Sequence, residues 1–151
     1  MKTFLVPVDF STITEEIIET ALTFARALKG KIVLLHTVQS QVITSEYALP
    51  VEALHEALVA EEKSSAAKLS DYATRFRVAG LAAETFVRQG PPVTVILEVA
   101  NEVNADFIIM GSHGHGRLYD LLVGSTASGV IKGTKCGIII MPPSDKNKKT
   151  S

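Results

Sequence analysis

Short apolar runs alternate along this chain with longer segments in which apolar residues recur at helical spacing. The apolar runs predict strands over residues 3–8, 32–38, 83–88, 107–110 and 137–141. The helical spacing predicts helices that begin near residues 12, 51, 93 and 125. Five strands that alternate with four helices favour parallel pairing. The expected fold is therefore α/β, a single doubly wound parallel sheet with helices on both faces.

The first two helices carry signals for where they begin and end. Thr12 and Glu15 have the spacing of a capping box, and Gly30 is expected to end the first helix. The second helix is expected over residues 51–78, with Gly80 as its stop. The residues expected to face inward are Ile17, Ala21, Phe24, Ala25 and Leu28 in the first helix and Leu54, Leu58, Leu69, Ala73 and Phe76 in the second.

Pro7 conflicts with the strand predicted around it. Proline cannot donate a backbone hydrogen bond and is disfavoured in a central strand. However, Pro7 stands near the C-terminal end of the strand, and this end lines the ligand crevice in open α/β sheets.

The length and composition indicate the class of protein. The 151 residues fit one domain, expected over residues 1–143 and followed by a polar tail over 144–151. Lys and Arg number 15 against 16 Asp and Glu, which disfavours binding of nucleic acid through a broad basic face. The single cysteine, Cys136, excludes an internal disulfide. No apolar run approaches the ~20 residues that span a bilayer, and no leader pattern precedes the first strand. We therefore expect a cytoplasmic protein without a membrane or nucleic-acid partner.

The most informative segment runs from Gly111 to Thr126, with the sequence GSHGHGRLYDLLVGST. It leaves the end of the fourth predicted strand, where ligands bind in open α/β sheets. Its glycines permit positive φ angles and a close approach of backbone N–H groups to an anion. Gly124 and Ser125 then begin a helix, whose N-terminus attracts negative charge. A phosphate group is the expected ligand, although a purely structural turn is the alternative.

Other nucleotide and catalytic motifs do not fit. The chain has no Walker sequence, and Tyr119 stands where a dinucleotide fingerprint needs its third glycine. The chain also has no G-x-S-x-G nucleophile elbow. A hydrolase or transferase of that kind is disfavoured for lack of a nucleophile–base pair.

With these motifs the chain resembles the universal stress protein family, in its nucleotide-binding branch. The ATP motif of that family, G-x2-G-x9-G-[ST], is matched by Gly111, Gly114, Gly124 and Ser125. Residues 6–11, 34–38 and 105–114 resemble the first, second and fourth strands of the family with their following turns. The resemblance covers residues 2–141 and implies the strand order 3-2-1-4-5.

The resemblance also implies a binding site for adenine nucleotide. Pro7, Val8 and Asp9 would line the adenosine side, and Thr37 would contact adenine through its backbone. The residues implied to surround ribose and phosphates are Gly111, Ser112, His113, Gly114, His115, Gly116, Arg117, Gly124, Ser125 and Thr126. The sequence departs from the family at Thr37, where valine is usual, at Gly137, where proline is usual, and at the additional Gly116.

Several of these residues could have a structural or solvent-exposed role in place of a binding role. Asp9 could hold a ribose hydroxyl or a phosphate-bound metal, or it could cap a helix. His113 and His115 could contact phosphate or stay solvated, and no metal is assigned to them. Arg117 could bind phosphate or be an exposed arginine. His36 is expected to be a hydrogen-bonded core histidine, and Ser125 a phosphate donor rather than a nucleophile.

The resulting hypothesis is an ATP- or AMP-binding stress-response regulatory protein. Mg²⁺ can accompany the phosphates, and hydrolysis of ATP would at most be slow because no catalytic base is identified. The alternative is a dimeric interaction module of the same fold that binds no nucleotide. In either case the resemblance implies a homodimer through the edge strand at Gly137–Met141.

Overall fold

The computed structural model describes residues 1–39, 50–113 and 123–143. Residues 40–49, the site residues Gly114, His115, Gly116 and Arg117, and the predicted tail lie outside the described residues. In chain order the elements are β1 (Thr3–Pro7), α1 (Thr14–Leu28), β2 (Lys31–Val38), α2 (Val51–Val78), β3 (Ala83–Gln89), α3 (Pro92–Glu102), β4 (Phe107–Gly111), α4 (Ser125–Gly133) and β5 (Gly137–Met141).

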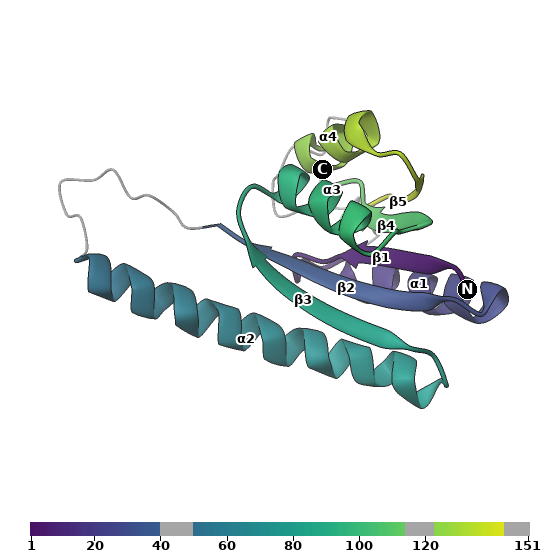
Figure 1. Ribbon diagram of the computed structural model, residues 1–151, viewed down its shortest axis with the longest axis horizontal. Helices are drawn as coiled ribbons and strands as arrows, with labels where there is room; N and C mark the ends of the chain where they lie inside the picture. The colour runs from purple at the N-terminus through teal and green to yellow at the C-terminus, as the bar shows by residue number, and fades with distance from the viewer. Residues whose placement is uncertain (40–49, 114–122, 144–151) are drawn as a thin grey trace.

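The five strands form one parallel sheet in the order β3-β2-β1-β4-β5. This arrangement confirms the predicted α/β fold and its strand order. Figure 1 shows α3 and α4 on one side of the sheet, with α1 and α2 on the other. The long helix α2 extends well past the ends of the strands (Figure 1).

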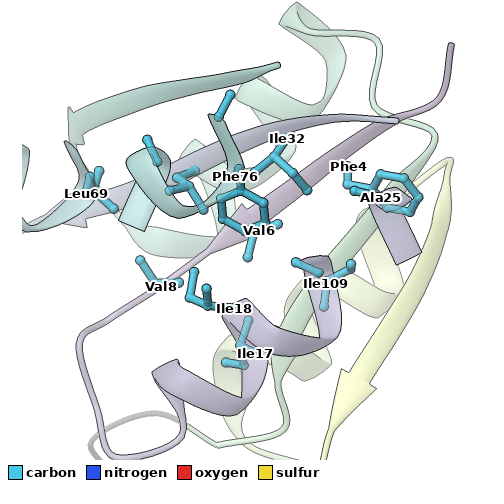
Figure 2. Close-up of a cluster of buried hydrophobic side chains, with 14 of the residues drawn as sticks. Phe4, Val6, Val8, Ile17, Ile18, Ala25, Ile32, Leu69, Phe76 and Ile109 are labelled. Carbon is cyan, nitrogen blue, oxygen red and sulfur yellow. The ribbon is translucent and has the colours of Figure 1, made fainter. Parts of the chain in front are cut away.

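Two apolar cores lie on the two faces of the sheet. Alternate side chains of β1 supply both, since Phe4 and Val6 pack in one core and Leu5 packs in the other. Figure 2 shows the first core, in which Phe76 of α2 lies near Val6 and Ile32. Because both faces are covered, the central strands can be apolar throughout, as the sequence shows.

The predicted ends of α1 are wrong in detail. The N-cap position is Ile13 and not Thr12, and within residues 1–39, 50–113 and 123–143 no side chain caps this helix end, so Thr12 and Glu15 do not form the predicted capping box. The helix ends through Lys29, which adopts the left-handed conformation at φ 50°. Gly30 instead leaves space for a core side chain, because a Cβ atom there would lie 2.5 Å from the ring of Phe4.

The inward stripes of both long helices are narrower than predicted. Phe24 and Leu28 of α1 are 38% and 47% exposed, so they were wrongly assigned to the core. In α2 the buried residues lie in the C-terminal half, whereas Leu54 and Leu58 are only half-buried. The sheet therefore covers the C-terminal half of α2 but not its N-terminal half.

Pro7 fits β1 because the neighbouring strand has already diverged. The carbonyl of Thr3 accepts a hydrogen bond from the Asp106 N–H, which marks the β4 side of β1. Residues two positions apart in a strand face the same neighbour, so the nitrogen of Pro7 also faces β4. The pairing of β1 with β4 ends at Leu5 and Ile108. Pro7 therefore forfeits no bond in this ladder.

No helix within residues 1–39, 50–113 and 123–143 is both long and apolar enough to cross a membrane.

Candidate functional site

A cleft of about 1350 Å³ lies where the C-terminal ends of β1 and β4 separate. Strand ends, helix N-termini and the N-terminal half of α2 form its walls. The lining residues are Pro7, Val8, Asp9, Phe10, Ile13, Ile17, Leu35, His36, Thr37, Gln39, Val51, Leu54, His55, Ala57, Leu58, Glu61, Ser64, Ser65, Lys68, Pro92, Ile96, Met110, Gly111, Ser112, His113, Ser125, Thr126 and Ala127. The crevice is at the switch point of strand order, the usual place for a ligand in this class of sheet.

The turn after β1 brings a carboxylate to the cleft. Asp9 accepts a hydrogen bond at Oδ1 from the Ser11 N–H, at 2.9 Å. Phe10, between them, has φ 60°, which is unusual for a bulky side chain. Asp9 therefore shapes this turn and lines the cleft. It does not cap α1, which begins at Thr14 with Ile13 as its N-cap, so the capping alternative considered from the sequence is wrong.

The end of β2 contacts the same turn. His36 donates a hydrogen bond from Nδ1 to the Val8 carbonyl, at 2.8 Å. Its ring lies against that of Phe10, with the centroids 4.5 Å apart. Thr37, the next residue, also lines the cleft. His36 is hydrogen-bonded as expected, but it is half-buried in the cleft wall rather than enclosed in a core.

Backbone contacts of Ser112 join the ends of β4 and β5 to the start of α4. The Ser112 N–H donates to the carbonyl of Met141, at 2.8 Å, and the Ser112 carbonyl accepts from the Gly124 N–H, at 2.6 Å. The buried Ser112 Oγ is 2.8 Å from Nδ1 of His113. The described part of the glycine-rich loop is thus held by its own strand, the edge strand and the following helix.

Of the two described glycines of the motif, Gly124 is needed for space, and neither is needed for a positive φ. Neither Gly111 nor Gly124 has a positive φ, contrary to the expectation for Gly111. A Cβ atom at Gly124 would lie 2.9 Å from the Ser112 carbonyl oxygen, closer than real Cβ contacts allow. At Gly111 the nearest atom, the carbonyl oxygen of His113, would be 3.3 Å away.

The N-terminus of α4 opens toward the cleft. Gly124 is its N-cap, and none of the described side chains caps this end. Ser125 and Thr126, in the first turn, line the cleft together with Ala127. Unpaired amides and the helix dipole at such an end attract an anion. Two hydroxyl side chains stand beside them as further donors.

The predicted site residues that the structure describes gather around this cleft. Those that line it are Pro7, Val8, Asp9, Thr37, Gly111, Ser112, His113, Ser125 and Thr126. Gly124 adjoins them through its bond to Ser112. The structure places no ligand on these residues, so their binding roles stay predictions.

Sequence reasoning missed the wall that α2 contributes. Leu54, Leu58 and Lys68 line the cleft, and the Lys68 ammonium lies 4.9 Å from the ring centroid of Phe10. The order of β2 and α2 in the chain could have predicted this wall. The segment between β2 and α2 starts at the carboxyl end of β2, so the first turns of α2 must begin near that end of the sheet.

Within the described residues, no group of three or more His, Cys, Asp or Glu side chains is arranged to hold a metal ion. Asp9 and Glu61 are the carboxylates among the cleft-lining residues. A cation in this cleft would therefore need ligands from the bound molecule as well.

Comparison with known proteins identifies relatives over nearly the whole chain. The family model described as Universal stress protein family matches residues 1–142. Universal stress protein Sll1654 of Synechocystis is 29% identical over 142 residues, covering 93% of this chain and 85% of that protein. Universal stress protein MJ0577 of Methanocaldococcus jannaschii is 26% identical over 152 residues, covering 93% of this chain and 94% of its own.

Solved structures show the same fold. The structure of MJ0577 superposes with a TM-score of 0.84 at 25% identity, covering 95% of this chain and 97% of that one. A universal stress protein in complex with cAMP has a TM-score of 0.66 at 24% identity, with coverage of 95% and 98%. The universal stress protein from Archaeoglobus fulgidus in complex with dAMP has a TM-score of 0.62 at 22% identity, with coverage of 93% and 97%.

Proposed function

Because this chain belongs to the universal stress protein family, we propose that it is a regulatory protein that binds an adenine nucleotide, ATP or AMP. The nucleotide occupies the cleft between the C-terminal ends of β1 and β4. One observation carries the proposal: the N-terminus of α4, which no side chain in the described part of the chain caps, opens into a cleft at the switch point of the sheet. In this proposal, occupancy of the cleft reports the energy state of the cell to a partner.

The phosphates bind at the α4 end of the cleft. The amides of the first turn, with the hydroxyls of Ser125 and Thr126, supply hydrogen-bond donors to a phosphate. Gly124 keeps this end open, since a side chain there would displace the Ser112 carbonyl. The predicted contacts of Gly114, His115, Gly116 and Arg117 with the phosphates belong to the same proposal.

The nucleoside binds over the C-terminal ends of β1 and β2. Val8, Ile96 and Met110 give the cleft apolar surface for a base, and Thr37 offers backbone groups at the end of β2. Asp9 offers a carboxylate to the ribose hydroxyls, which are hydrogen-bond donors. Pro7 completes this wall.

Two relatives support the choice of an adenine nucleotide. One structure of this fold is a complex with cAMP and another is a complex with dAMP. Both ligands contain adenine, a sugar and one phosphate, and these three parts match the apolar wall, the carboxylate and the helix N-terminus in the proposed cleft.

Mg²⁺ would enter with the phosphates. Mg²⁺ commonly uses one or two protein carboxylates together with substrate phosphates and water. Asp9 is the residue placed to provide such a carboxylate. Hydrolysis of ATP would be slow at most, because phosphoryl transfer needs a base or group that positions the attacking water.

Calorimetric titration of the purified protein with ATP, ADP and AMP tests the proposal. We expect a micromolar Kd for at least one of them, about −8 kcal/mol. Mass spectrometry of nucleotide released by denaturing the purified protein identifies the form bound in the cell. Absence of binding at millimolar concentration of all three would reject the proposal in favour of an interaction module that binds no nucleotide.

We also propose that the protein is a homodimer through β5. The side chains of Ile139 and Met141 pack toward one core and those of Ile138 and Ile140 toward the other. Within the described residues β5 pairs with β4 alone, so its other edge offers backbone groups to a second copy. Antiparallel pairing with the same strand would satisfy both edges about one two-fold axis.

Light scattering coupled to size exclusion tests the dimer. We expect a mass near twice the 16.2 kDa of one chain. Proline at position 139 removes one N–H from the strand and should shift the mass toward one chain or make the protein insoluble. A mass of one chain for the unmodified protein at tens of micromolar would reject the dimer.

A further inference from the structure

A left-handed aromatic residue stands at the mouth of the cleft. Phe10 has φ 60°, and bulky residues rarely adopt this conformation. Such outliers persist when surrounding contacts hold them, and they concentrate at functional sites. The contacts around Phe10 therefore indicate what the turn is built to hold.

Among the described residues, contacts from β2 and α2 and one bond within the turn itself hold this conformation. The ring of His36, from β2, lies 4.5 Å from the Phe10 ring, centroid to centroid, with the ring planes 34° apart. Lys68, from α2, places its ammonium 4.9 Å from the Phe10 centroid. Within the turn, the Ser11 N–H donates to Asp9 Oδ1 at 2.9 Å. The result is a left-handed backbone directly after the carboxylate that faces the cleft.

The hydrogen bond of His36 fixes where this turn begins. A carbonyl oxygen can only accept, so the 2.8 Å bond between His36 Nδ1 and the Val8 oxygen requires the proton on Nδ1. The Val8 N–H in turn donates to the Leu35 carbonyl at 2.8 Å. Both polar backbone groups of Val8 are thus anchored to β2, one residue before Asp9.

We propose that His36 is the positioning residue of the nucleotide site. Its Nδ1–H and its ring together hold Val8 and Phe10, and so set the direction in which Asp9 presents its carboxylate to the cleft. This inference rests on the proposed function for its ligand. It assigns a binding role to a strand residue that the pattern of apolar positions alone assigns to the core.

Two replacements of His36 separate the hydrogen bond from the ring. In His36→Asn the side-chain amide can donate from nearly the place of Nδ1, without the ring. In His36→Phe the ring stays and the donor is lost. Val99→Ala, in the core on the opposite face and outside the cleft lining, is the matched control for lost stability.

Calorimetric titration with ATP measures the effect on binding. We expect His36→Phe to weaken binding about tenfold or more, and His36→Asn to retain most of it. In the background of Asp9→Asn, His36→Phe should weaken binding little further, because the carboxylate that His36 orients has already been removed. Equal affinities of His36→Phe and the unmodified protein, or additive effects of the two replacements, would overturn the proposal.

An NMR measurement on the ligand-free protein tests the positioning role of His36 without relying on nucleotide binding. The ¹⁵N shifts of His36 should show the proton on Nδ1. The Ser11 amide, which reports its bond to Asp9, should shift in His36→Phe and stay in place in His36→Asn and Val99→Ala. If the unmodified protein binds no nucleotide, the proposed function fails alone, and an unmoved Ser11 amide in His36→Phe would then refute the positioning role.

Discussion

The two ends of the seam between β1 and β4 are built differently. At the N-terminal end, Thr3 and Asp106 exchange two hydrogen bonds, each 2.8 Å long, and the rings of Phe4 and Phe107 stack with centroids 5.5 Å apart. At the C-terminal end the pairing stops after Leu5, and the strands diverge to form the cleft. The same two strands are closed at one end and open at the other.

This difference separates stability from ligand binding. A parallel pair gains stability from its hydrogen bonds, and the hydrogen bonds between β1 and β4 lie at the closed end of this seam. The open end keeps polar backbone groups and a helix N-terminus accessible, which costs stability but provides donors for a ligand. Replacements at the two ends should therefore change different measurements.

The largest expected effect is at the closed end. Phe4 is fully buried and stacks on Phe107, so Phe4→Ala removes a core ring and leaves a cavity in its place. We expect a loss of about 3–5 kcal/mol in the free energy of unfolding. Chemical denaturation followed by circular dichroism measures this loss.

The nucleotide affinity of folded Phe4→Ala should stay close to that of the unmodified protein. The ring lies under Gly30, at the end of the sheet opposite the cleft. A drop in affinity of more than tenfold, measured where the variant is fully folded, would show that the two ends are not independent.

The next effect is at the open end. Gly124→Ala would place a Cβ atom 2.9 Å from the Ser112 carbonyl oxygen, so the loop and the start of α4 must move apart. We expect the affinity for nucleotide to fall about tenfold or more, equivalent to about 1.4 kcal/mol. Calorimetric titration measures the change.

Gly129→Ala is the matched control for this replacement. It makes the same chemical change in the same helix, where the Cβ atom would lie 2.8 Å from a methyl group of Val93. That methyl belongs to a side chain outside the cleft lining, so the crowding should leave the affinity unchanged. Equal losses of affinity in the two variants would argue against a specific role of Gly124.

The strands, their order and the place of the candidate site were the more predictable from the sequence. Continuous apolar runs such as residues 32–38 and 137–141 predict covered strands, because a parallel sheet buries both faces of its strands. The bounds predicted for α2 and β5 are confirmed, and so is the strand order that the family resemblance implied. The place of the candidate site followed from topology, since ligands bind at the carboxyl ends of such strands.

The details around the cleft were less predictable because they depend on tertiary contacts. Thr12 and Glu15 have capping-box spacing, but the turn at Phe10 leads into the helix with Ile13 as its N-cap. Phe24 has the periodicity of a core residue, yet it lies at the margin of what the sheet covers. Lys68 has no motif, and its position over Phe10 follows from the docking of α2.

A smaller effect on binding is expected at Asp9. In Asp9→Asn the side-chain oxygen can still accept the Ser11 N–H, so the turn should persist and the Tm of the ligand-free protein should change little. Loss of the negative charge should weaken nucleotide binding several-fold, and more strongly with Mg²⁺ present. Titrations with and without Mg²⁺ measure the difference. A large loss of Tm with unchanged affinity would assign Asp9 to structure alone.

The smallest effect is a pH dependence at the closed end. The Thr3 N–H donates to Asp106, and this bond, helped by the nearby charge of Lys2, holds the pKa of Asp106 below its ordinary value. A carboxylate whose pKa is lowered in the folded state stabilises the fold above its unfolded pKa, about 3.9, and this contribution disappears as the pH falls through the folded value.

We therefore expect Asp106→Asn to lower the Tm slightly at pH 7, since the amide oxygen can still accept from Thr3 but lacks the charge. The difference in Tm from the unmodified protein should begin to shrink as the pH falls below about 4 and should approach zero as the pH falls through the lower folded-state pKa, where the carboxyl of the unmodified protein becomes protonated. Because Asp106 is exposed, salt should reduce the difference at neutral pH. Thermal unfolding of both proteins from pH 7 to pH 3 measures this dependence. A difference that stays constant over that range would show that the charge of Asp106 does not strengthen the closed end of the seam.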